Sequence, residues 1–376
     1  MKISAALPTL LVLGTTIGYQ SAFAQSSVTL YGIADTSVRY LTNADSANNN
    51  KLSLTNGAIS NSRWGVKGTE DLGGGLSAIF RLESGINLQD GTGSDSQRLF
   101  NRYAYVGLSS AYGTLTLGRQ TNVLFDLLGS TYDPLTVGNY FENAWLPYAL
   151  ASGLYADNAI KYAGTLAGLS MEAMYSFGTN FESTGASGFS GQVPGHLGAG
   201  NQYGLTLSYT AGPVSVGAAF QQTSDNSSRK QTVFNVNAVY AFSTVKLFAG
   251  YLYGKDDTGF VDSALAQRNL VLGTDILPGS GRKDSAPFTG ITWQATPALA
   301  LTGAGYYDHM QNAAIGGGDV GSGNRYTLVA LAEYSLSKAT QVYGTVDFNH
   351  VSGAADVELP GRDNQTGLGV GIRHVF

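Results

Sequence analysis

Hydrophobic and polar residues alternate along most of this chain, with a period of two. In the segment 232–242 apolar side chains occupy every second position, and the positions between them include Asn235 and Asn237. The same alternation returns at 169–177, 203–209, 245–253 and 342–348. Because successive side chains of a β-strand point to opposite faces of the sheet, the pattern predicts strands with one apolar and one polar face.

Turn residues divide the chain into about 16 such strands of roughly 8–14 residues each. Short turns are expected near residues 70–74, 111–113, 167–168, 212–213, 243–244, 296–297 and 337–339. Long polar loops are expected near residues 43–57, 179–201, 256–284, 311–323 and 353–365. An even number of strands, with tight turns at one rim and long loops at the other, is typical of an outer-membrane barrel. The sequence therefore predicts an all-β fold, a transmembrane antiparallel β-barrel.

A soluble β-sandwich is the alternative fold with the same alternation. Its strands are nearer about five or six residues long, and its outer face carries charges because it meets water. The strands predicted here are longer, and only 12% of the residues are charged, against about 25% in ordinary globular proteins. In lipid, only a closed sheet leaves no unpaired backbone edge, and this favours the barrel.

The first residues resemble a secretory signal peptide. Lys2 provides a positive start, an apolar run follows, and Ala22, Phe23 and Ala24 form the small-x-small pattern of a cleavage site. We expect a signal peptide at residues 1–24 and the barrel at residues 25–376. No later run reaches the roughly 18 apolar residues that a membrane-spanning helix requires.

Cysteine content and charge exclude several kinds of site. The chain has no cysteine, so neither a disulfide framework nor a thiolate metal site is possible. Removal of Lys2 with the leader leaves 20 of the 21 basic residues against 26 acidic ones, a net charge of −6. A nucleic-acid partner normally requires a basic face. We therefore expect no cofactor, no metal and no nucleic acid.

The last strand ends on an aromatic residue. Leu368, Val370 and Ile372 share one face with Phe376, which closes the sequence. A terminal Phe on an alternating strand resembles the signal that the outer-membrane assembly machinery recognises. Phe376 is therefore the candidate assembly signal, and the segment is equally the final strand of the barrel.

Five motifs occur in order along the chain: SVTLYG from Ser27, SRWGVKGTEDLGGGL from Ser62, RYAYVGL from Arg102, LGRQ from Leu117 and DNAIKY from Asp157. Together they resemble the general porins of Gram-negative bacteria, in their β-proteobacterial branch. The resemblance covers essentially the whole of residues 25–376. It implies a homotrimer in the outer membrane whose water-filled channels admit small hydrophilic solutes and ions by passive diffusion.

The resemblance also implies a third long loop that folds into the lumen and carries acids opposite a basic wall. The matching loop runs from about residue 120 to 157, and its length points to a functional role. Its candidate constriction acids are Asp126, Asp133 and Glu142. Asp133 stands in a Tyr-Asp-Pro-Leu sequence, where the family's loop places an acid, although the Pro-Glu-Phe-Gly-Gly element of enteric relatives is absent.

Strand parity and the resemblance predict five basic residues at the constriction: Arg63, Arg102, Lys67, Arg81 and Lys161. By parity, Arg102 lies on the face opposite to Tyr103 and Tyr105. Lys161 is the candidate substitute for an arginine that many relatives carry where this chain has Ala163. The local basic residues favour anions and the negative charge of the whole chain favours cations. Since screening at physiological salt acts over about 8 Å, we expect the local charges to decide and anions to be preferred.

Arg119 shares its parity with Leu115 and Leu117, so it is expected on the lipid-facing side. An arginine there costs about 2–4 kcal/mol near the midplane of the bilayer and roughly 0–1 kcal/mol near its interfaces. Either Arg119 lies near the rim or another subunit covers it. Trimeric relatives bury this side of the barrel, so we expect Arg119 at the trimer interface.

A barrel enzyme, a substrate-selective porin and an adhesin are the alternative functions. An enzyme would need a nucleophile with a histidine near the rim. No recognisable nucleophile motif contains one of the four histidines, His196, His309, His350 and His374. Sugar selectivity would need an aromatic row in the lumen, for which Tyr31 and Tyr343 are the main candidates. Adhesion through the long loops is compatible with conduction.

Overall fold

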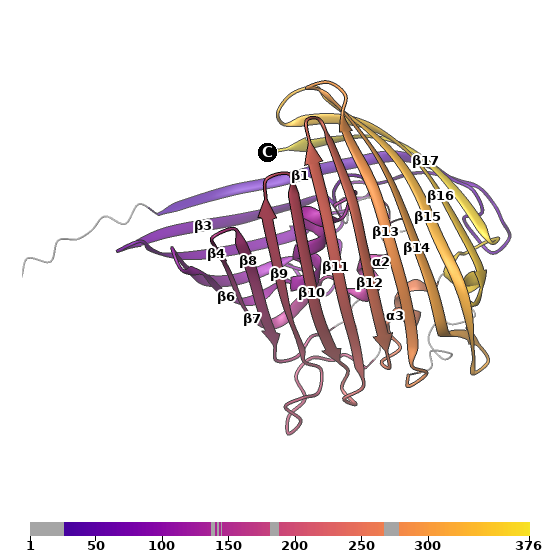
Figure 1. The fold of residues 1–376 in the computed structure, drawn as a ribbon, viewed down its shortest axis with the longest axis horizontal. Helices are drawn as coiled ribbons and strands as arrows, with labels where there is room; N and C mark the ends of the chain where they lie inside the picture. Colours follow the sequence, from indigo (N-terminus) through magenta and orange to yellow (C-terminus); the bar gives the residue numbers. More distant parts are fainter. Residues whose placement is uncertain (1–25, 137–139, 141–142, 144, 181–187, 267–277) are drawn as a thin grey trace, which may run out of the picture.

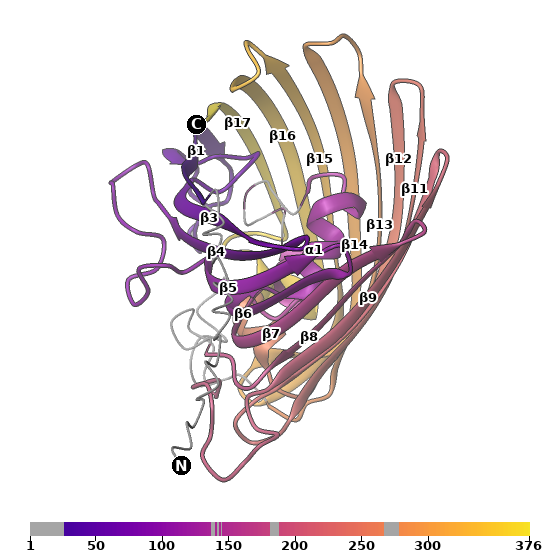
Figure 2. The same cartoon turned by 90° about the vertical axis from the view of Figure 1, so that its left-hand side faces the viewer.

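The computed structural model describes residues 26–136, 140, 143, 145–180, 188–266 and 278–376. In these residues the chain forms one antiparallel sheet that curls and closes on itself (Figures 1 and 2). The strands are β1 (Ser27–Leu41), β2 (Lys51–Asn56), β3 (Arg63–Gly73), β4 (Leu76–Gly85), β5 (Tyr103–Ser110), β6 (Gly113–Thr121), β7 (Tyr155–Leu166), β8 (Leu169–Ser176), β9 (Gln202–Ala211), β10 (Val214–Ser224), β11 (Lys230–Phe242), β12 (Val245–Asp256), β13 (Arg282–Gln294), β14 (Leu299–Gly316), β15 (Asp319–Ser335), β16 (Thr340–Gly353) and β17 (Asn364–Val375). The expected signal peptide, residues 1–24, lies outside the described residues.

Strands β2 and β3 are two parts of one wall strand, because both pair with β1. Counted together they give the 16-stranded barrel that the sequence predicts. The break between them, residues 57–62, is held by Asp35 of β1. The Oδ2 atom of Asp35 accepts a hydrogen bond from the Ser60 amide at 2.8 Å. The backbone amide of Asp35 donates to Ser62 Oγ at 2.9 Å. Gly57 is required here because a Cβ atom would overlap the Asp35 carboxylate.

The ring is closed by β17, which lies between β16 and β1. At the end of this strand Phe376 pairs with Gly32 through two backbone hydrogen bonds of 2.9 and 3.1 Å. The role of Phe376 as an assembly signal stays a prediction. In the described part of the chain, no helix has the length and apolar character needed to cross a membrane.

The predicted alternation is confirmed, and it gives the barrel an apolar outer face. In β11, Phe234, Val236 and Tyr240 are exposed on the outside, whereas Asn235 and Asn237 are buried on the inside. A barrel in lipid needs this arrangement, because the bilayer can solvate only the apolar side chains. The inner face is therefore polar, and it is where charged groups can gather.

The two rims differ as predicted, with two corrections. Residues 51–56 of the expected loop 43–57 form strand β2, which pairs with β1. The short turns lie where the sequence places them, but residues 311–323 are not a long loop. Strand β14 continues to Gly316 and β15 begins at Asp319, so the two strands meet in a tight turn. Gly317 and Gly318, with φ values of +66° and +87°, make this turn possible because glycine adopts such angles without a steric cost.

The segment between β6 and β7, called here the inner loop, carries three short helices: α1 (Val123–Leu127), the π-helix η1 (Leu128–Tyr132) and α2 (Trp145–Leu150). Asn122 caps α1 by accepting a hydrogen bond from the Phe125 amide at 2.9 Å. Two further short helices, α3 (Phe260–Leu265) and the 3₁₀-helix η3 (Ala354–Glu358), lie in loops at the opposite rim from the short turns. Figure 2 shows α1 within the curve of the sheet.

Candidate pore constriction

The inner loop packs on inward-facing glycines of the wall. A Cβ atom on Gly217 would approach the Tyr132 ring to 2.6 Å, and one on Gly290 would approach Pro134 to 2.5 Å. The same is true of Gly254 and Leu150, at 2.7 Å. The apolar residues of the loop join inward-facing wall residues in one buried cluster. Because these wall positions are glycines, the inner loop packs closely against β10, β12 and β13.

Basic side chains face the loop from the other side of the barrel. Arg63 and Lys67 of β3 share a face with Arg81 of β4, since Lys67 pairs directly with Arg81 in the sheet. Lys67 is exposed, and its Nζ atom lies 5.2 Å from the centre of the Tyr31 ring. This placement agrees with the parity argument for all three residues.

Glu83 lies at the centre of this basic group, although it was not among the predicted site residues. Its side chain has no exposed surface, and its carboxylate lies 2.6 Å from both Arg81 and Arg102. The arginine side chains retain 28% and 13% exposure. Tyr31 also donates to Glu83, at 2.8 Å. The acid is thus covered by its partners, while the cations still reach the solvent.

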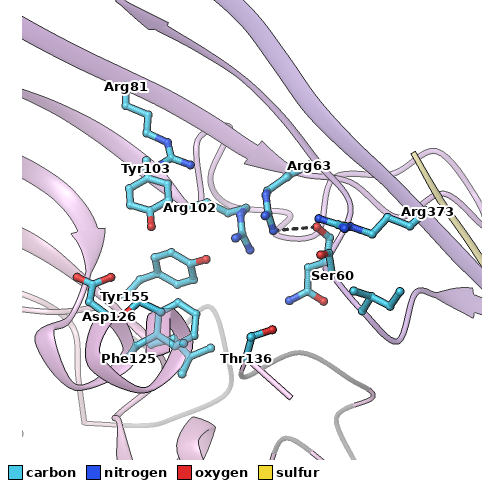
Figure 3. A pocket seen from close by; sticks show the side chains of 15 residues that line it. Ser60, Arg63, Arg81, Arg102, Tyr103, Phe125, Asp126, Thr136, Tyr155 and Arg373 are labelled. Carbon is cyan, nitrogen blue, oxygen red and sulfur yellow. Dashed lines mark hydrogen bonds between the residues drawn. The ribbon is translucent and has the colours of Figure 1, made fainter. Parts of the chain in front are cut away.

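A cavity of about 390 Å³ separates these arginines from the inner loop. Figure 3 shows Arg63, Arg81, Arg102 and Arg373 around it, with Asp126 on the loop side. Phe125 and Tyr155 line the same space, beneath the arginines in this view. Four guanidinium groups and one carboxylate thus border the cavity.

Lys161 and Asp126 join the wall to the inner loop. The Nζ atom of Lys161 forms an ion pair with the Asp126 carboxylate and also donates to the Thr121 carbonyl at 3.1 Å. Both residues line a second cavity, of about 320 Å³, together with Glu172 of β8. The structure therefore brings the predicted lysine and the predicted acid together.

Comparisons with known proteins agree with this architecture. Residues 10–354 match the family model described as Gram-negative porin. This chain belongs to the Gram-negative porin family. It is 31% identical to an outer membrane porin protein of Bordetella pertussis, over 98% of this chain and 99% of the relative. It is 30% identical to outer membrane porin protein 32 of Delftia acidovorans, over 95% and 96%.

Among solved structures, an anion-selective porin from Comamonas acidovorans superimposes with a TM-score of 0.71 at 25% identity. The match covers 94% of this chain and all of that one, 100%. The protein is therefore an outer-membrane channel through which solutes diffuse passively. The inward-facing charged side chains described above, such as Arg63, Arg81 and Arg102, therefore line the interior of the channel.

Arg102 of this porin does not follow the predicted parity. Tyr103 and Tyr105 face inward, because Tyr105 pairs with Arg81 in the sheet and the Arg81 guanidinium lies 3.8 Å from the Tyr103 ring centre. Arg102 faces inward as well. It precedes the first residue of β5, so strand alternation does not govern its direction.

Asp133 is buried and does not offer an open charge to the cavity, contrary to expectation. Its side chain is nearly inaccessible, and its Oδ1 atom accepts a hydrogen bond of 2.5 Å from Tyr306 of β14. It anchors the inner loop to the wall opposite the arginines. Glu142, the third predicted acid, lies outside the described residues.

Arg119 needs no second subunit to cover its charge. In the sheet Arg119 pairs with Ala104 of β5, in the same parity as Leu117, and a register shift against β7 lies beside it. The guanidinium lies 2.5 Å from the Asp157 carboxylate and donates to the Asn101 carbonyl at 2.8 Å. The charge is thus paired within the subunit, which removes the argument that placed Arg119 at a trimer interface.

Two further arginines of the wall form ion pairs with acids in the loops at the rim opposite the short turns. Arg282 of β13 is buried and lies 2.7 Å from Asp262 of α3 and 3.0 Å from Glu358 of η3. Arg325 of β15 lies 3.2 Å from the same Glu358. Burial raises the pKa of the Asp262 carboxyl, and the Arg282 guanidinium opposes that shift. The single residue Glu358 therefore joins two wall strands to the last loop.

Proposed function

We propose that the porin prefers anions and that the cavity beside Arg63, Arg102 and Arg373 is its constriction. The observation that carries this proposal is that the arginine side chains are partly exposed to solvent, whereas Glu83 beside them is not. Glu83, which neutralises part of the arginine charge, is fully covered, whereas Arg63 retains 24% exposure. A permeating ion therefore approaches guanidinium groups more closely than it approaches this carboxylate. The porin from Comamonas acidovorans, with which this chain superimposes, is anion-selective, and this supports the same proposal.

The reversal potential of single channels in a KCl gradient tests it. We expect the sign for anion preference in the wild-type protein and a shift towards zero in the double variant R63Q/R102Q. One charge about 10 Å from an ion changes the energy of that ion by about 0.4 kcal/mol in water, roughly a twofold change in occupancy. Arg362 lies exposed in the last loop, so R362Q is the matched control. A cation-selective wild type, or an equal shift in R362Q, would contradict the proposal.

We further propose that the porin is a homotrimer. An apolar hollow of about 810 Å³ lies on the outer face over β1, β2 and β14–β17. Val38, Leu52 and Val370 line it and are exposed in the single chain. A second subunit could cover this hollow with apolar surface. Native mass measurement of the detergent-solubilised protein decides the matter, since a monomer alone would refute the trimer.

We also propose that the chain is a channel without catalytic activity of its own. His309 and His374 support this view, because they hydrogen-bond Asn324 and Thr340 at 2.9 Å and not a serine nucleophile. Incubation of the folded protein with ester and peptide substrates tests it. Turnover that survives repeated purification would contradict the proposal.

A further inference from the structure

A row of polar side chains crosses six neighbouring strands on the outer face of the barrel. Its members, called here the polar row, pair with one another in register from β9 to β14: Tyr203, Gln222, Thr232, Lys255, Lys283 and Gln311. Lys255 is the last residue but one of β12, and Lys283 is the second residue of β13. The row therefore lies at the rim that carries the long loops.

Apolar and aromatic side chains lie directly beside the polar row, two residues further from that rim. On β9 to β12 these outward positions are Leu205, Phe220, Phe234 and Tyr253. The ring centres of Phe220 and Phe234 are 5.2 Å apart, and Tyr203 lies 6.1 Å from Phe220. Aromatic girdles mark the interfaces of a membrane barrel. The polar row thus lies at the level where lipid headgroups begin.

Lys255 and Lys283 are direct neighbours across two paired strands. Such neighbours have Cβ atoms about 4.5–5.5 Å apart, and like charges placed in this way repel each other. The Nζ atom of Lys255 lies 3.1 Å from Asp257. Lys283 is exposed and has no ion-pair partner within the described ranges. Two adjacent cations with one carboxylate leave a positive charge on a surface that faces lipid.

The neutral members of the polar row are already ordered by hydrogen bonds. Tyr203 donates to Gln222 Oε1 at 2.7 Å, and Gln222 Nε2 donates to Thr232 Oγ1 at 3.0 Å. On the other side, Gln311 is exposed beside Lys283. The lysines therefore stand between polar side chains that can hydrogen-bond an oxygen-rich headgroup.

We propose that the polar row binds the phosphorylated headgroup of an anionic lipid in the outer leaflet. Lys255 and Lys283 hold the phosphate, since clusters of basic residues at a membrane surface attract anionic lipids. The acyl chains then lie along Phe220, Phe234 and Tyr253. A lipid fits better than a soluble anion because the apolar side chains beside the lysines face the bilayer. This inference is independent of the ion selectivity of the channel.

Native mass spectrometry of the detergent-solubilised full-length barrel tests the proposal. The probes are diphosphorylated lipid A, the same lipid without its phosphates, and inorganic pyrophosphate. We expect the phosphorylated lipid to bind most tightly and the double variant K255Q/K283Q to bind it about thirtyfold more weakly. The matched control is K338Q, which removes an exposed lysine from the short turn at the opposite rim.

Each outcome is decisive. Loss of lipid binding in K255Q/K283Q with retention in K338Q supports the site, provided that the variant keeps the heat-modifiable electrophoretic mobility of a folded barrel. Equal affinity for the phosphorylated and dephosphorylated lipids overturns the proposal. So does an equal effect of K338Q, and so does pyrophosphate that binds as tightly as the lipid.

Discussion

The guanidinium carbon of Arg325 lies 4.5 Å from the centre of the Trp145 ring. Trp145 begins α2 of the inner loop, and its Nε1 atom donates to Thr327 of β15 at 2.8 Å. Because Arg325 also binds Glu358, one wall strand holds both the inner loop and the last outer loop. The position of the constriction is thus linked to the loops at the mouth of the channel.

Trp145→Phe should loosen α2 from the wall. The ring stays under Arg325, but the hydrogen bond to Thr327 is lost at a cost of about 1 kcal/mol. We expect more frequent current fluctuations in single-channel recordings, with little change in mean conductance. Trp293→Phe on the outer face, where the side chain is 47% exposed, is the control. Indistinguishable noise in the two variants would refute the linkage.

Gly290→Ala should displace the inner loop from its contact with β13. The new Cβ would lie 2.5 Å from Pro134, whose ring cannot rotate away, and overpacking of this kind costs about 1–3 kcal/mol. We expect a changed single-channel conductance and a lower temperature of barrel unfolding on gels. Gly303→Ala on the adjacent strand, with its nearest neighbour at 3.7 Å, should leave both properties unchanged. If Gly290→Ala kept the wild-type conductance, the inner loop would not pack against Gly290.

Glu83→Gln should strengthen anion preference and destabilise the wall. The amide cannot neutralise Arg81 and Arg102, and removal of one partner from a buried ion pair costs about 3–5 kcal/mol. We expect a reversal potential further in the anion direction and earlier thermal unfolding. Glu70 is exposed near a short turn, so Glu70→Gln serves as the comparison. If Glu83→Gln left selectivity unchanged, the arginine cluster would not control permeation.

Asp126→Asn and Lys161→Gln should change selectivity in opposite directions. Each substitution leaves the remaining partner of this pair unneutralised beside the cavities that it lines. We expect Asp126→Asn to favour anions and Lys161→Gln to favour cations relative to the wild type. The double variant, which restores the charge balance, should return towards the wild-type reversal potential. Shifts of the same sign in both single variants would rule out an electrostatic role.

Alternation alone was enough to predict the strands, the rims and the inward direction of Arg63, Lys67 and Arg81. It failed at Arg102, because parity holds only within an uninterrupted strand. Arg102 precedes the first residue of β5. The inward position of Glu83 could have been predicted, since it lies two residues from Arg81 on the same strand.

The position of Asp133 depends on a contact that the sequence does not reveal. Its partner Tyr306 lies 173 residues away along the chain. Only the closure of the barrel brings β14 against the inner loop. The same applies to Glu358, whose two arginine partners belong to different strands. Long-range pairing of this kind leaves no local pattern from which to infer it.

Residues 57–62 stand outside the strand pairing, and Ile59, Ser60 and Asn61 border the cavity beside the arginines. Insertions or deletions in this break can therefore change the width of the opening without turning any outward side chain away from lipid. A change of one residue within a continuous strand would reverse every face beyond it. Solute preference can thus diverge between relatives at this position, while the surface that keeps the protein in its membrane stays constant.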